Sequence, residues 1–90
     1  MKRIYKYLLP ITAIPSIDMP KGAKILSIQA PGNYPQIWAL VDPEAIPEKR
    51  LFSIYETGQS VANDDKQTFI GTVQLDGGGT VVHVFEFMPL

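Results

Sequence analysis

The sequence predicts a mainly β domain, a small antiparallel sandwich or barrel of six to seven strands with at most one short helix. Three observations lead to this fold class. Short runs rich in β-branched and aromatic residues recur between prolines and glycines. No stretch of ten or more residues keeps a helical period of 3.6 without a proline or glycine breaking it. Finally, three glycines at 77–79 separate two β-branched runs, as in a β-hairpin.

Six runs have the length and composition of strands, and the segment 36–42 is apolar at successive positions, which indicates a central strand covered on both faces. The six runs are 3–9, 23–30, 36–42, 50–58, 68–76 and 80–87. Pro10, Pro15 and Pro20 exclude a helix before the second run and confine any strand there to a sheet edge. Residues 1–20 are therefore expected to form either an edge strand or a flexible arm.

Two polar segments are expected to be loops, namely 43–49 and 59–67, and the single short helix would lie in 43–49 or 59–66. Ninety residues are enough for one core only, so the expected organisation is a single domain over 1–90. The chain has no cysteine, which excludes disulfides, thiolate metal sites and a thiol nucleophile. A core this small often gains stability by self-association, so a homo-oligomer is expected.

The charges are distributed unevenly, with a net charge of +4 over residues 1–24 and −5 over the remainder. A basic end can attract anions, but no aromatic-basic motif of a nucleic-acid reader accompanies it, so nucleic acid is not an expected partner. Lys6, Pro10 and Pro15 interrupt the apolar stretch that a signal peptide needs. No run approaches the roughly 18 apolar residues of a membrane span, so the expected location is intracellular, away from the membrane.

His83 is the only histidine, and on a strand it would share a face with Val81, Phe85 and Phe87. A catalytic histidine needs an orienting acid and a nucleophile, and a metal-binding histidine needs further ligands. We therefore interpret His83 as a structural residue with a ring nitrogen bonded to a backbone carbonyl or a neighbouring side chain.

The glycine-rich segment 76–80 lacks the lysine of a phosphate-binding loop, so Gly78 is expected to serve the hairpin turn and Gly58 the turn after its strand. Five carboxylates lie in loops without the spacing of a calcium site, and they are Asp42, Glu44, Glu48, Asp64 and Asp65. The sequence thus predicts no catalytic residue, no metal site and no cofactor, and the chain is not expected to be an enzyme.

Trp38 is the single tryptophan, and we predict that it anchors the core of the central strand. The alternative is an interface hot spot or a platform that stacks a base. The tyrosines suit an interface as well as a core rim. The expected interface or ligand surface consists of Tyr5, Tyr7, Lys2, Lys6, Tyr34 and Tyr55.

Four segments occur in an order that resembles a group of small uncharacterised proteins of tailed bacteriophages and prophages. They are MPKGAKILSIQ (19–29), IWALVDPEAIPEKRLFSIYETG (37–58), FIGTVQL (69–75) and VVHVFE (81–86). The resemblance implies an accessory gene product that works in the cytoplasm of a bacterial host. It carries no functional residues to this chain, because none is established for the group.

Three functions remain open from the sequence. The leading hypothesis is a non-enzymatic protein that binds a host protein or a defence component. The second is an oligomeric protein that sequesters a small molecule or nucleotide, with Lys2 and Lys6 beside Tyr5 and Tyr7 serving an anion. The third is a minor structural protein of the virion.

Overall fold

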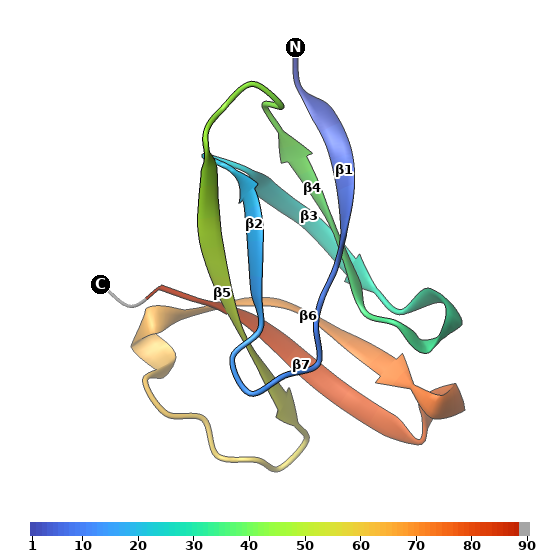
Figure 1. The fold of residues 1–90 in the computed structure, drawn as a ribbon. Coiled ribbons are helices and arrows are strands. Elements are labelled where there is room, and N and C mark those ends of the chain that lie inside the picture. Colours follow the sequence, from blue (N-terminus) through green and yellow to red (C-terminus); the bar gives the residue numbers. More distant parts are fainter. Residues whose placement is uncertain (89–90) are drawn as a thin grey trace.

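The computed structural model describes residues 1–88, and these residues form seven strands in two antiparallel sheets (Figure 1). The strands are β1 (Arg3–Leu8), β2 (Ser16–Pro20), β3 (Lys24–Gln29), β4 (Gln36–Val41), β5 (Pro47–Glu56), β6 (Gln67–Leu75) and β7 (Thr80–Phe87). A three-stranded sheet has the order β1-β4-β3, and a four-stranded sheet has the order β2-β5-β7-β6. The described residues contain no α-helix, only short 3-10 turns at Pro31–Asn33, Asp64–Lys66 and Asp76–Gly78. The predicted fold class, a mainly β sandwich or barrel of six to seven strands, is confirmed, and the two sheets correspond to the sandwich.

The prolines and the apolar runs determine where the strands lie in the sheets. β4 is the central strand of its sheet, as its apolar sequence predicted, but only one of its two faces is buried, so the expected cover on both faces is wrong. β2, which ends in Pro20, lies at an edge of the four-stranded sheet, and β1 lies at an edge of the other. The prediction of a loop over 43–49 is wrong in its second half, because β5 begins at Pro47. Pro47 pairs with Pro20 of the edge strand, and proline is tolerated at the first residue of a strand.

The core lies between the inner faces of the two sheets, and alternate residues of β2, β4 and β7 are buried in it. Burial of one such aliphatic or aromatic side chain contributes about 1.5–3 kcal/mol. The buried cluster consists of Leu9, Ile17, Met19, Ala23, Ile28, Ile37, Ala39, Val41, Phe52, Val73, Val82 and Val84.

The two sheets approach each other closely where β3 meets β6. A Cβ atom added to Gly71 would lie 2.7 Å from Cγ2 of Ile28, which is closer than van der Waals contact allows. Gly71 follows a β-bulge, because the register between β6 and β7 shifts between Phe69 and Gly71. The glycine is therefore the residue that permits this close approach.

A pair of side-chain hydrogen bonds joins the loop between β3 and β4 to the turn between β6 and β7. Asn33 Nδ2 donates to Asp76 Oδ1 at 2.8 Å, and the backbone N–H of Asp76 donates to Asn33 Oδ1 at 2.5 Å. Both residues have left-handed backbones, with φ of 73° and 54°. Asparagine and aspartate tolerate this conformation better than other residues with a side chain. The contact ties one sheet to the other at the right-hand end of Figure 1.

Replacing Asn33 by alanine is expected to lower the free energy of unfolding by about 2 kcal/mol, because two hydrogen bonds are lost and alanine tolerates a positive φ poorly. The matched control is Asn63→Ala, since Asn63 also has a left-handed backbone (φ 55°) but no side-chain capping bond. Urea denaturation measures both variants. Equal losses in the two would mean that the hydrogen bonds to Asp76 contribute nothing.

Candidate functional site

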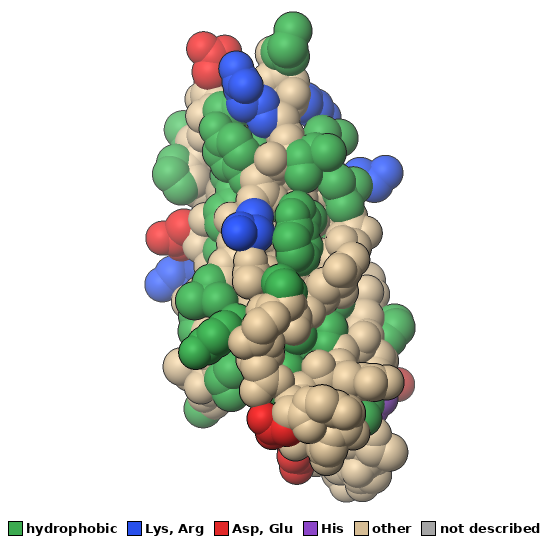
Figure 2. Space-filling view, turned by 90° about the vertical axis from the view of Figure 1, so that its right-hand side faces the viewer, with side chains coloured by type: hydrophobic (Ala, Val, Ile, Leu, Met, Phe, Trp, Pro, Cys, Tyr) green, Lys and Arg blue, Asp and Glu red, His purple; other side chains and the backbone are tan. Residues whose placement is uncertain are grey.

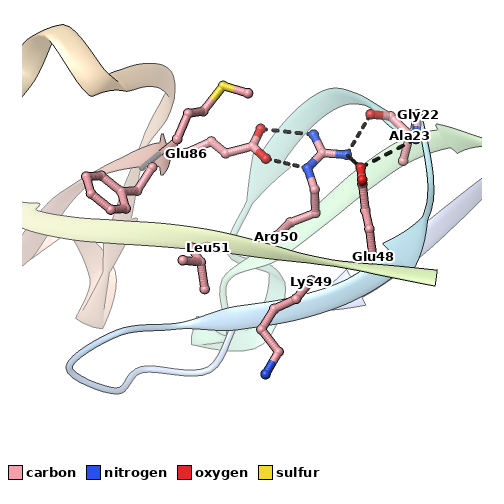
Figure 3. Close-up of a pocket in the computed structure, with 9 residues that line it drawn as sticks. Gly22, Ala23, Glu48, Lys49, Arg50, Leu51 and Glu86 are labelled. Atoms are coloured by element: carbon pink, nitrogen blue, oxygen red, sulfur yellow. Dashed lines mark hydrogen bonds and ion pairs between the residues drawn. The ribbon is translucent and has the colours of Figure 1, made fainter. Parts of the chain in front are cut away.

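Arg50 of β5 and Glu86 of β7 form an ion pair at one end of the core (Figure 3). Arg50 Nη2 donates to Glu86 Oε1 at 2.9 Å, and Arg50 Nε donates to the other carboxylate oxygen. A third bond runs from Arg50 Nη1 to the backbone carbonyl of Ala23 at 2.9 Å. The two side chains are only 15% and 11% exposed. Arg50 thus joins β5, β7 and the turn that leads into β3.

The geometry around Arg50 points to a structural role. The hydrogen bonds to Glu86 raise the pKa of Arg50 above its ordinary value, so the guanidinium stays charged and cannot exchange protons in catalysis. An open pocket of about 400 Å³ lies beside the pair. The ammonium of Lys49 points away from Arg50 and Glu86 (Figure 3). The pair was not predicted from the sequence, although one signal was present. Glu86 shares a strand face with Val82 and Val84, which indicates a buried carboxylate that requires a positively charged partner.

His83 lies on the outer face of the four-stranded sheet, where both of its ring nitrogens bond to threonine hydroxyls. Nε2 lies 2.8 Å from Thr57 Oγ1, and Nδ1 lies 2.9 Å from Thr72 Oγ1. These partners are hydroxyls, and neither is the carboxylate that would orient a catalytic histidine. Within residues 1–88, no group of three or more His, Asp or Glu side chains is placed to hold a metal ion.

An aromatic cluster occupies the same outer face. Tyr55 and Phe69 each meet Phe85 edge to face, with ring centroids 5.6 Å and 5.3 Å apart. Loops of the chain itself lie beside this cluster: Val61 lines an open pocket together with all three rings, and Ile14 lines another pocket that includes Tyr55. The outer face of the four-stranded sheet is therefore partly covered by its own chain.

The outer face of the three-stranded sheet carries a different set of side chains, which we call the outer β4 face. Strand pairing places Ile4 beside Leu40 and Lys6 beside Trp38, with Leu8 next along β1. Ile4 and Leu8 are 62% and 60% exposed. Lys24 of β3 pairs with Leu40 from the other side. Figure 2 looks onto the side that carries β1 and shows hydrophobic side chains gathered over its upper part with Lys and Arg among them.

Trp38 lies at the centre of the outer β4 face, between Lys6 of β1 and Ser27 of β3. The prediction that Trp38 anchors the core is wrong, because the alternation of β4 turns Ile37, Ala39 and Val41 inward and leaves Trp38 half-buried on the opposite face. The sequence showed that both faces of β4 are apolar, but it did not show which face the second sheet covers.

The residues of the predicted tyrosine–lysine surface do not come together. The ring centroids of Tyr5 and Tyr7 lie 6.5 Å apart on one face of β1. Lys6 lies on the other face, and Lys2 precedes the strand. The exposed Tyr34 follows the turn between β3 and β4, and Tyr55 belongs to the aromatic cluster of the other sheet. Burial, with a smaller contribution from Tyr5, raises the pKa of Tyr7, so its phenol stays neutral at physiological pH.

The two glycines predicted for turns adopt left-handed backbones that favour glycine. Gly58 has a φ of 90° after β5, and Gly78 has a φ of 98° between β6 and β7. Both lie at the ends of strands that bear the aromatic cluster and His83.

Residues 1–88 contain no helix with the length and hydropathy that crossing a lipid bilayer requires.

Comparisons with known proteins place the chain in a family. The comparison with curated proteins gives no match, and the comparison with solved structures gives none either. A family model described as "Domain of unknown function (DUF7352)" matches residues 1–89, and the chain belongs to this family.

Proposed function

We propose that the chain is a non-enzymatic binding protein that recognises another protein through the outer β4 face. The observation that carries this proposal is the position of Trp38 at the centre of a face whose neighbours Ile4 and Leu8 are more than half exposed. Exposed apolar patches of this kind usually mark interaction sites, and tryptophan is one of the residues enriched in binding hot spots.

The engagement of the polar groups elsewhere supports binding rather than catalysis. His83 is held by two threonines, and Arg50 is paired with Glu86. The alternative of a protein that sequesters an anionic small molecule needs Lys6 on the same side as Tyr5 and Tyr7, whereas β1 places it on the opposite face.

The resemblance to small proteins of tailed phages and prophages supplies the proposed setting. In that setting the partner is a protein of the bacterial host or one of its defence components, and the binding takes place in the bacterial cytoplasm. The lysines that flank Trp38 and Leu40 favour a partner with an acidic surface.

Replacing Trp38 by alanine is expected to weaken binding of the partner about 30-fold, because loss of a central hot-spot side chain costs at least ~2 kcal/mol. The tagged protein is used to isolate its partner from host lysate, and the affinity of the purified pair is measured by biolayer interferometry. Phe69→Ala is the matched control, since Phe69 is an exposed aromatic (55%) on the other sheet.

Circular dichroism verifies that both variants remain folded. Loss of binding in Phe69→Ala with retention in Trp38→Ala would contradict the proposed surface. Recovery of no specific protein by the unmodified chain would contradict protein binding itself.

A further inference from the structure

The four sheet edges differ in how well they are protected against pairing with another chain. An edge strand offers unpaired N–H and C=O groups, and proteins block such edges with prolines, bulges or charges. The β2 edge is flanked by Pro15 and ends in Pro20. β3 is bulged between Ile25 and Ser27, and β6 is bulged between Phe69 and Gly71.

β1 has no proline and no bulge, so its charged residues are the only one of these devices that it carries. It pairs with β4 in an unbroken register from Arg3 to Leu8 and contains no proline. Five of its six residues are exposed, and Ile4 and Leu8 belong to the outer β4 face. β1 is therefore the edge at which a further strand can extend the sheet with regular geometry, next to the surface that the proposed function uses.

The charges of β1 define the chemistry of such a strand. Arg3 and Lys6 are its charged residues, Lys2 precedes them, and the first acidic residue of the chain is Asp18. Like charges on neighbouring strands are destabilising, so a second copy of this basic strand fits poorly. An acidic strand with aliphatic residues satisfies both the charges and the apolar side chains.

We propose that the protein partner docks as an extended segment antiparallel to β1, with acidic side chains beside Arg3 and Lys6 and aliphatic side chains beside Ile4 and Leu8. This inference rests on the proposed function and adds the mode of recognition. Main-chain hydrogen bonds to the free edge of β1 hold the segment, and the flanking side chains select its sequence.

The test uses a synthetic probe that matches β1 position by position, acetyl-Val-Thr-Glu-Thr-Val-Glu-amide with a fluorescent label. Its affinity is measured by fluorescence anisotropy, and its site is mapped by backbone amide NMR shifts of the full chain. Shifts are expected at Arg3–Leu8 (β1) and not at Ser16–Pro20 (β2), which is an edge strand of the other sheet.

Three modified probes separate strand addition from general attraction. An added strand bonds to β1 only through the backbone N–H groups that point toward β1, and these belong to alternate residues of the probe. N-methylation of that set of residues therefore abolishes binding, whereas N-methylation of the other set is tolerated. A probe with lysine in place of glutamate is expected to bind at least about tenfold more weakly, and Lys6→Glu in the protein is expected to have a similar effect on the original probe.

Each outcome distinguishes this inference from the proposed function. Equal binding of both N-methylated probes would overturn strand addition while leaving a partner-binding surface. Failure of the probe to bind, with a dimer in analytical ultracentrifugation that Tyr5→Pro disrupts, would assign the β1 edge to a second copy and overturn the acidic segment. Failure to bind with a monomeric protein would overturn it as well, whereas the Trp38→Ala measurement would still decide the proposed function.

Discussion

Replacing Glu86 by alanine is expected to lower the free energy of unfolding by about 3 kcal/mol. The substitution leaves the guanidinium of Arg50 buried without its carboxylate, and removal of one partner from a buried ion pair typically costs 3–5 kcal/mol. The value lies at the lower end because the two side chains retain 15% and 11% exposure. Arg50 would keep its bond to the carbonyl of Ala23, which is neutral and compensates only in part.

Urea denaturation gives this free energy, and Glu48→Ala is the matched control. Glu48 is the other acid near Arg50, but it lies 3.8 Å from Nη1 and is 39% exposed, so its loss is expected to cost less than about 1 kcal/mol. The double variant Arg50→Met with Glu86→Leu is expected to recover most of the stability, because it removes both charges together. Similar losses for Glu86→Ala and Glu48→Ala would contradict a buried, interdependent pair.

Replacing Gly71 by alanine is expected to lower the free energy of unfolding by about 2 kcal/mol. The new Cβ atom would lie 2.7 Å from Cγ2 of Ile28, so the two sheets must move apart where β3 meets β6. Overpacking of a core commonly costs 1–3 kcal/mol. The φ of Gly71 is not positive, so backbone strain does not contribute to the expected loss.

A double-mutant cycle with Ile28→Ala isolates this contact. Ile28→Ala alone leaves a cavity and is expected to cost about 3 kcal/mol. In that background Gly71→Ala is expected to be nearly neutral or stabilising, because the clashing methyl group is gone and alanine restricts the unfolded chain. The same cost for Gly71→Ala in both backgrounds would show that the close approach of the sheets does not depend on this glycine.

The strands themselves were predictable because local chemistry determines them. The prolines at 10, 15 and 20 placed β2 at an edge, and the glycines at 77–79 placed a hairpin between β6 and β7. The start of β5 at Pro47 was not predicted from the sequence. Pro47 belongs to a strand because it pairs with Pro20, which is distant in the sequence.

The features that depend on packing of one sheet on the other were not predictable. Alternation divides β4 into two apolar faces, but only the position of the other sheet decides that Ile37 is buried and Trp38 is not. The same holds for Arg50, whose partner Glu86 lies 36 residues away. Alternation did separate Lys6 from Tyr5 and Tyr7, and this rule would have excluded the tyrosine–lysine surface from the sequence alone.

The central claim is that the outer β4 face contacts a partner protein, and site-specific photo-crosslinking in a bacterial host tests it most directly. A benzophenone-bearing phenylalanine is introduced at position 38 in one variant and at position 69 in another, and protein adducts are identified after irradiation. An adduct with a host protein at position 38 and none at position 69 is the expected result. An adduct at position 69 alone, or none at either position, would contradict the claim.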